Sequence, residues 1–148
     1  MKKEFTLTIY TENQVGLINK IAIMFSRRKI SLESLNTSPS EIENIYRFTL
    51  VVFETETVIR NLVRQLEKQI DVLKVYYNTN EEIIWQQMAL YKVATSTIMK
   101  DVKVERLLRE YGAKAVVIRE DFTVFETTGQ DEEINNLLKE LHKYGLIE

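Results

Sequence analysis

The chain has 148 residues, of which 45% are hydrophobic and 28% charged, a composition typical of a globular protein with a buried core. Its 20 basic and 22 acidic residues leave a net charge of -2, which excludes a broad basic surface for nucleic acid or an anionic membrane. The absence of cysteine excludes disulfides, thiolate metal sites and cysteine nucleophiles. Because residues 1–5 contain no apolar signal-peptide core and no stretch is long enough to span a bilayer, we expect a cytoplasmic protein.

The first half of the chain shows strand and helix patterns in turn. Residues 4–11 alternate between apolar and polar, which predicts a half-buried strand. The spacing then predicts a helix from Leu17, strands over 30–37 and 45–53, a second helix and a closing strand over 72–77. The first helix has an apolar stripe of Leu17, Ile18, Ile21, Ala22 and Phe25, and the second has one of Ile59, Leu62, Val63, Leu66 and Ile70. The predicted order is β-α-β-β-α-β.

The second half repeats this order after a polar break at 78–82. Strands are predicted near 88–94, 114–119 and 122–128, and Leu146 and Ile147 begin a last strand. The two helices carry Val104, Leu107, Leu108 and Tyr111, and Ile134, Leu137, Leu138 and Leu141. The sequence therefore predicts an α+β protein of two tandem ferredoxin-like βαββαβ sandwiches, with domains at 1–79 and 80–148. Apolar residues occur on both faces of the 88–94 strand, so its buried face stays open.

We also expect a homodimer. Each half has about 70 residues, a size at which a single core gives marginal stability and oligomerisation is a common remedy. The strand over 30–37 would be a sheet edge in this topology, and it has few of the charges or prolines that protect an edge. Edge-to-edge pairing about a two-fold axis would join two copies.

The loop before the first helix is the best candidate for a binding site. Gly16 starts the helix after residues 12–15, so backbone amides could approach a ligand closely there. A helix N-terminus suits a carboxylate, and the Asn13 side chain could accept a hydrogen bond from an ammonium group. A structural explanation is that Asn13 caps the helix and Gly16 permits close packing. The residues alone favour this explanation without excluding the ligand site.

No catalytic constellation or metal site is predicted. His142, the only histidine, has no partner residue with which to act, and Glu81, Glu82 and the acidic run 131–133 lie in the predicted linker and at a helix start. The chain has no phosphate-binding glycine loop, dinucleotide fingerprint or nucleophile elbow. A small enzyme on a ferredoxin-like scaffold stays an alternative, because that fold hosts many functions.

Four segments together resemble one family. They are 11–18 (TENQVGLI), 24–28 (MFSRR), 30–35 (ISLESL) and 72–75 (VLKV). This combination is similar to the small subunit of acetohydroxyacid synthase, which has an ACT domain at its N-terminus. The resemblance is strong over the first half and, from Asn80 onward, lies mainly in element order. It implies an amino-acid-sensing, dimerising ACT domain at 1–79 and a C-terminal ferredoxin-like small-subunit domain at 80–148.

The resemblance also implies a regulatory, non-catalytic role. The partner would be a large catalytic subunit that uses thiamine diphosphate, Mg²⁺ and usually FAD, and this chain would hold no cofactor. The small subunit would activate that partner and mediate feedback inhibition by valine or a related branched-chain amino acid bound at the ACT dimer interface. The matching effector positions are Asn13, Val15, Gly16, Leu17 and Ile18, with Ser31 supplied by the neighbouring subunit.

Position 31 departs from the pattern. Many family members have Asn where this chain has Ser31, so the shorter side chain would reach the effector through water, or sensitivity would be reduced. An alternative to the small-subunit hypothesis is a stand-alone ACT-type module that binds another amino acid and regulates a different enzyme or a transcription factor.

Overall fold

The computed structural model describes all residues, 1–148, as two compact units. The first unit comprises Met1–Ile84 and the second Trp85–Glu148, compared with the boundary between Thr79 and Asn80 that the sequence suggests. No helix in either unit is both long and apolar enough to cross a membrane.

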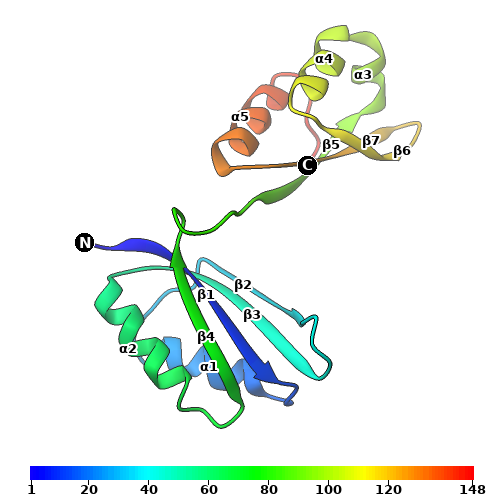
Figure 1. Cartoon of the computed structure of the whole chain (residues 1–148). Helices are drawn as coiled ribbons and strands as arrows, with labels where there is room; N and C mark the ends of the chain where they lie inside the picture. Colours follow the sequence, from blue (N-terminus) through cyan, green and yellow to red (C-terminus); the bar gives the residue numbers. More distant parts are fainter. The chain divides into compact units, whose positions relative to one another are not determined.

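The first unit is a four-stranded antiparallel sheet with two helices on one face (Figure 1). The strand order is β2-β3-β1-β4, so β2 and β4 are the edges. This arrangement confirms the predicted βαββαβ order of a ferredoxin-like sandwich. The elements are β1 (Lys3–Glu12), α1 (Leu17–Ser26), β2 (Ser34–Pro39), β3 (Ile45–Glu54), α2 (Glu56–Leu66) and β4 (Val72–Thr79).

The core of this unit follows the apolar periodicity of the sequence. Every second residue of β1 from Phe5 to Thr11 is buried, because that face lies under the helices. Helix α1 buries Leu17, Ile21 and Phe25, one residue on each successive turn. Two residues assigned to the apolar stripes are exposed: Ile18 is 41% exposed on the rim of α1, and Ile70 is 92% exposed because α2 ends at Leu66.

The strand β2 starts later than predicted. It begins at Ser34 rather than at Ile30, and Glu33 makes the first contact with β3 by donating its N–H to the Val51 carbonyl at 2.8 Å. Ile30 instead closes the end of α1, donating its N–H to the Phe25 carbonyl at 3.1 Å, and its side chain is buried. The apolar pattern near Ile30 therefore reflects core packing of a connection, which sequence periodicity alone cannot distinguish from a strand.

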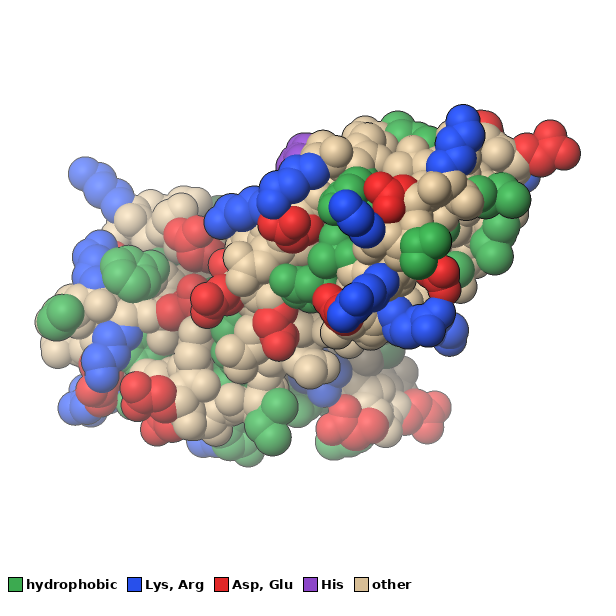
Figure 2. Space-filling model, turned by 90° about the horizontal axis from the view of Figure 1, so that it is seen from above, with side chains coloured by type: hydrophobic (Ala, Val, Ile, Leu, Met, Phe, Trp, Pro, Cys, Tyr) green, Lys and Arg blue, Asp and Glu red, His purple; other side chains and the backbone are tan.

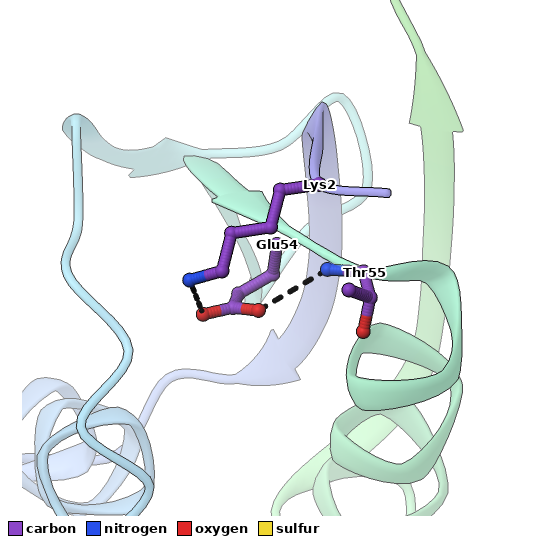
Figure 3. Close-up of polar contacts among 3 residues, drawn as sticks. All are labelled: Lys2, Glu54 and Thr55. Atoms are coloured by element: carbon purple, nitrogen blue, oxygen red, sulfur yellow. Dashed lines mark hydrogen bonds and ion pairs between the residues drawn. The ribbon is translucent and has the colours of Figure 1, made fainter.

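The N-terminus of α2 is stabilised by a neighbouring carboxylate rather than by its own N-cap side chain (Figure 3). Glu54 accepts the backbone N–H of Thr55 at 3.1 Å and the Lys2 ammonium at 2.7 Å. The hydrogen bond from Lys2, supported by the Thr55 amide, lowers the pKa of the Glu54 carboxyl below its ordinary value. A negative charge at this position also suits the positive end of the helix.

The second unit has a three-stranded antiparallel sheet in the order β5-β7-β6. The predicted last strand is reduced to an isolated antiparallel bridge between Leu146 and Val93, where Ile147 donates its N–H to the Lys92 carbonyl at 2.8 Å. The second sheet thus repeats the strand order of the first, with a single bridge in place of the fourth strand. The elements are β5 (Gln87–Ala94), α3 (Thr95–Lys100), α4 (Val102–Glu110), β6 (Lys114–Ile118), β7 (Phe122–Gly129) and α5 (Asp131–His142).

Two features of the second unit were not fixed by periodicity. Strand β5 buries Tyr91 and Val93 and exposes Met88 and Leu90, which settles the face that the sequence left open. Helix α3 was not predicted, because it buries no residue and so has no apolar stripe.

Candidate functional site

A small cavity lies in the first unit between the start of α1 and the sheet. Its volume is about 180 Å³, well below the roughly 300–1,000 Å³ of pockets for drug-sized ligands. One wall comes from the loop after β1 and the first turn of α1, and the other from β1, β2 and β3. It is lined by Thr11, Glu12, Asn13, Gln14, Gly16, Leu17, Ile18, Thr37, Tyr46 and Phe48.

The backbone at the start of α1 requires glycine. Gly16 is the N-cap residue with φ 82° and ψ 0°, a left-handed conformation that side chains disfavour. A Cβ built there would meet no atom within 4 Å, so the backbone angle rather than crowding imposes the glycine. No side chain caps the helix, which contradicts the explanation that Asn13 is the cap. Asn13 instead donates its backbone N–H to the Asn44 carbonyl at 3.2 Å.

The first turn of α1 therefore has unpaired donors on residues that line the cavity. The Leu17 amide donates to the Gln14 carbonyl at 3.3 Å, whereas the Gly16 and Ile18 amides have no acceptor in the protein. Free N–H groups and the positive end of the helix dipole together favour a carboxylate at this point.

The sheet side of the cavity combines apolar and hydroxyl groups. Phe48 and, from the helix, Leu17 are buried and give apolar walls. Thr11 lies opposite Tyr46 in the β1–β3 register, and Thr37 lies opposite Phe48 in the β2–β3 register. The Thr11 hydroxyl is fully buried and has no hydrogen-bond partner. The cavity thus suits a small ligand with a charged head and a compact side chain.

The structure brings together four of the six predicted effector positions. Asn13, Gly16, Leu17 and Ile18 line the cavity. Val15 is 104% exposed and does not line the cavity, and Ser31 is exposed in the connection between α1 and β2, outside the cavity of its own chain. Six lining residues were not among the predicted positions: Glu12 and Gln14 on either side of Asn13, and Thr11, Thr37, Tyr46 and Phe48 on the strands. Thr11 left a signal, because it is the one polar residue on the buried face of β1.

A larger hollow of about 560 Å³ between α1 and α2 has different chemistry. It is lined mainly by long, exposed side chains such as Arg27 and Lys68 and has no free helix N-terminus. Arg28 donates to the Met24 carbonyl at 3.0 Å, as expected of a cation at a helix C-terminus. On the face drawn in Figure 2, positive and negative side chains are interspersed rather than separated. The smaller cavity at Gly16 is therefore the better candidate for a specific ligand.

Each of the two units contains a region that matches a known family model. Residues 7–74 match the model of the AHAS small subunit-like ACT domain, and residues 86–148 match the model of the small subunit of acetolactate synthase. The acetolactate synthase small subunit of Bacillus subtilis (strain 168) is 34% identical over 149 aligned positions, covering 100% of this chain and 85% of the relative.

The chain belongs to the acetolactate synthase small-subunit family. Another small subunit, from Mycolicibacterium smegmatis, is 27% identical over 97% of this chain and 84% of its own length. The crystal structure of the acetolactate synthase small subunit from Thermotoga maritima has the same fold, with a TM-score of 0.85, 22% identity, and coverage of 99% of this chain and 91% of that one. The cavity at Gly16 thus lies in the ACT domain of a small subunit.

Proposed function

We propose that this chain activates the catalytic subunit of acetolactate synthase and mediates its feedback inhibition by valine or a related branched-chain amino acid. Membership of the small-subunit family supports a catalytic partner. That partner would hold the thiamine diphosphate, Mg²⁺ and FAD of the reaction. The observation that carries the sensing role is the uncapped start of α1 facing a cavity of amino-acid size.

The cavity can meet each part of a branched-chain amino acid. The carboxylate would accept hydrogen bonds from the amides of Gly16 and Ile18, which have no other acceptor. The Asn13 side-chain oxygen would accept a bond from the ammonium group. The aliphatic side chain would contact Leu17 and Phe48, which are buried and apolar. Both charged groups and the side chain would thus find a complementary surface.

A homodimer would complete this site. Strand β2 is a sheet edge whose residues are mostly exposed, and Thr37 of β2 lines the cavity. Pairing of two β2 edges would bring a second copy against this side of the cavity, where its Ser31 could contribute. Leu35→Lys, a substitution on this edge, should shift the chain toward monomer in sedimentation velocity, and an unchanged dimer would exclude pairing through β2.

Feedback requires the effector to distinguish two arrangements of the complex. The amino acid can inhibit only if it binds more tightly when the catalytic subunit is less active. A site shared between two small subunits satisfies this condition, because a change in how the two copies pair would change the site itself.

The test of this site is Gly16→Asp compared with Gly16→Asn. Both variants place a side chain at a left-handed residue, and asparagine tolerates that conformation, but only aspartate adds negative charge beside the carboxylate position. We expect Gly16→Asp to abolish valine inhibition while preserving activation of the copurified catalytic subunit, and Gly16→Asn to have the smaller effect. Full inhibition in Gly16→Asp would exclude this cavity.

Direct binding should be measured on the chain alone as well. Calorimetric titration with valine, leucine and isoleucine identifies the preferred effector, and Asn13→Ala should weaken binding of that amino acid. Wild-type affinity in Asn13→Ala would remove this side chain from the site. Absence of all binding would limit the proposal to activation of the catalytic subunit.

A further inference from the structure

The buried hydroxyl of Thr11 is unusual within this protein. Three threonine side chains are buried here, at positions 11, 123 and 127. The Thr123 hydroxyl is 2.9 Å from the Thr95 hydroxyl, and the Thr127 hydroxyl donates to the Tyr111 carbonyl at 3.1 Å. Thr11 has no partner, although a hydroxyl removed from water without a hydrogen bond destabilises the fold.

The position of Thr11 suggests why an unpaired hydroxyl is retained. It occupies the inner face of β1 at the end of the strand, two residues before Asn13, and it lines the cavity at Gly16. The neighbouring inner-face residues Phe5, Leu7 and Ile9 are all apolar and buried. A valine at position 11 would continue this face without an unpaired group, so packing does not explain the hydroxyl.

We propose that the Thr11 hydroxyl accepts a hydrogen bond from the ammonium group of the bound amino acid, a role that rests on the proposed sensing function. The ammonium group has three N–H donors, and the Asn13 side-chain oxygen satisfies one of them. Thr11 supplies a second acceptor on the sheet side, while the α1 amides take the carboxylate. The site thereby selects an α-amino acid over a carboxylic acid that has the same side chain and no amine.

If Thr11 has this role, Thr11→Val should change stability and valine affinity in opposite directions. The substitution removes the hydroxyl and keeps the shape of the side chain. The ligand-free variant should be at least as stable as the wild type, because an unpaired buried polar group is lost. Its affinity for valine should fall about tenfold, because a hydrogen bond to a charged group is lost. A purely structural residue would not raise stability and lower affinity together.

The experiment is an NMR titration of the full chain with valine and with 3-methylbutanoate, which is valine without its amine. The wild type should prefer valine, and Thr11→Val should lose most of this preference, whereas Thr11→Ser should keep it. Thr127→Val is the matched control: it breaks an existing hydrogen bond in the second unit, so it should lower stability and leave the preference unchanged.

Two results would overturn the assignment of Thr11 alone: a valine preference in Thr11→Val equal to that of the wild type, or a loss of stability in this variant as large as in Thr127→Val. A wild-type chain that binds neither compound, alone and in complex with the catalytic subunit, would overturn the sensing function together with it.

Discussion

The two units share a strand order but close their sheets differently. In the first unit, β4 pairs with β1 as a strand of eight residues. In the second unit, the corresponding place beside β5 is taken by a single bridge from Leu146. The same topology is therefore completed to different degrees, and the second sheet depends on fewer backbone hydrogen bonds at its edge.

The hydrophobic core is also larger in the first unit than in the second. Sixteen buried hydrophobic residues form the core of the first unit and seven form that of the second. Strand β6, at the other edge of the second sheet, is exposed along its whole length. Because burial of apolar surface is the main favourable term in folding, we expect the second unit to be the less stable one.

In the second unit, hydrogen bonds from side chains partly compensate for the smaller apolar core. The Tyr91 hydroxyl donates to the Ile134 carbonyl at 2.9 Å and ties β5 to α5. Glu133 accepts the Gln130 N–H at 3.0 Å and stabilises the start of α5. The cavity at Gly16 lies in the unit with the larger core, where the unpaired hydroxyl of Thr11 is easier to tolerate.

The largest expected effect comes from truncating a fully buried leucine in each unit. Leu137→Ala and Leu62→Ala should each cost about 2–5 kcal/mol. The second unit has the smaller core, so Leu137→Ala should unfold it while Leu62→Ala leaves the first unit folded. Hydrogen exchange followed by mass spectrometry resolves the two units in one sample. If Leu137→Ala leaves α5 protected, or if Leu62→Ala exposes β1 to the same extent, the proposed order of stability is wrong.

Many of the helices and strands, and part of the candidate site, could be predicted from local sequence patterns. The alternation along β1 and the apolar stripe of α2 gave their elements and most of their buried residues. The loop with Asn13 and Gly16 could be predicted as a site because few structural requirements, such as a left-handed backbone or a close approach, explain a glycine just before a helix. These features depend on residues that are close in sequence.

The parts that could not be predicted depend on distant partners. Tyr46 and Phe48 join the cavity only because β3 pairs with β1, and the start of β2 depends on where Glu33 meets Val51. The failure of Leu146 to extend into a strand likewise depends on β5. Periodicity states which face is apolar but not which residues of another element lie against it.

A smaller effect is expected for Tyr91→Phe, which tests the polar closure of the second unit. Loss of the hydrogen bond to Ile134 should cost about 1 kcal/mol, seen as a lower urea midpoint for that unit. Burial raises the pKa of the Tyr91 hydroxyl above its ordinary value of 10.0. The neutral form is therefore favoured in the folded state, so the contribution of Tyr91 to stability should be constant below pH 10.0 and be lost as the pH rises through the raised pKa.

The variant itself separates this titration from general alkaline unfolding. Tyr91→Phe should lose the part of the alkaline decline that belongs to the second unit, whereas Tyr10→Phe, on the exposed side of the first sheet, should keep it. An identical alkaline decline in wild type and Tyr91→Phe would show that Tyr91 ionisation does not contribute.

The smallest effect is expected in the first unit, at Glu54. Its pKa is lowered by the hydrogen bond from Lys2 and by the Thr55 amide, so the charged form is favoured in the folded state. The resulting stability should be present above pH 4.5 and be lost as the pH falls through the lowered pKa. Glu54→Gln should flatten this acid dependence in the first unit only, while Lys2→Met should keep part of it because the Thr55 amide still favours the carboxylate. Equal flattening in both units would mean that Glu54 acts on the whole chain, and that the two units do not unfold independently.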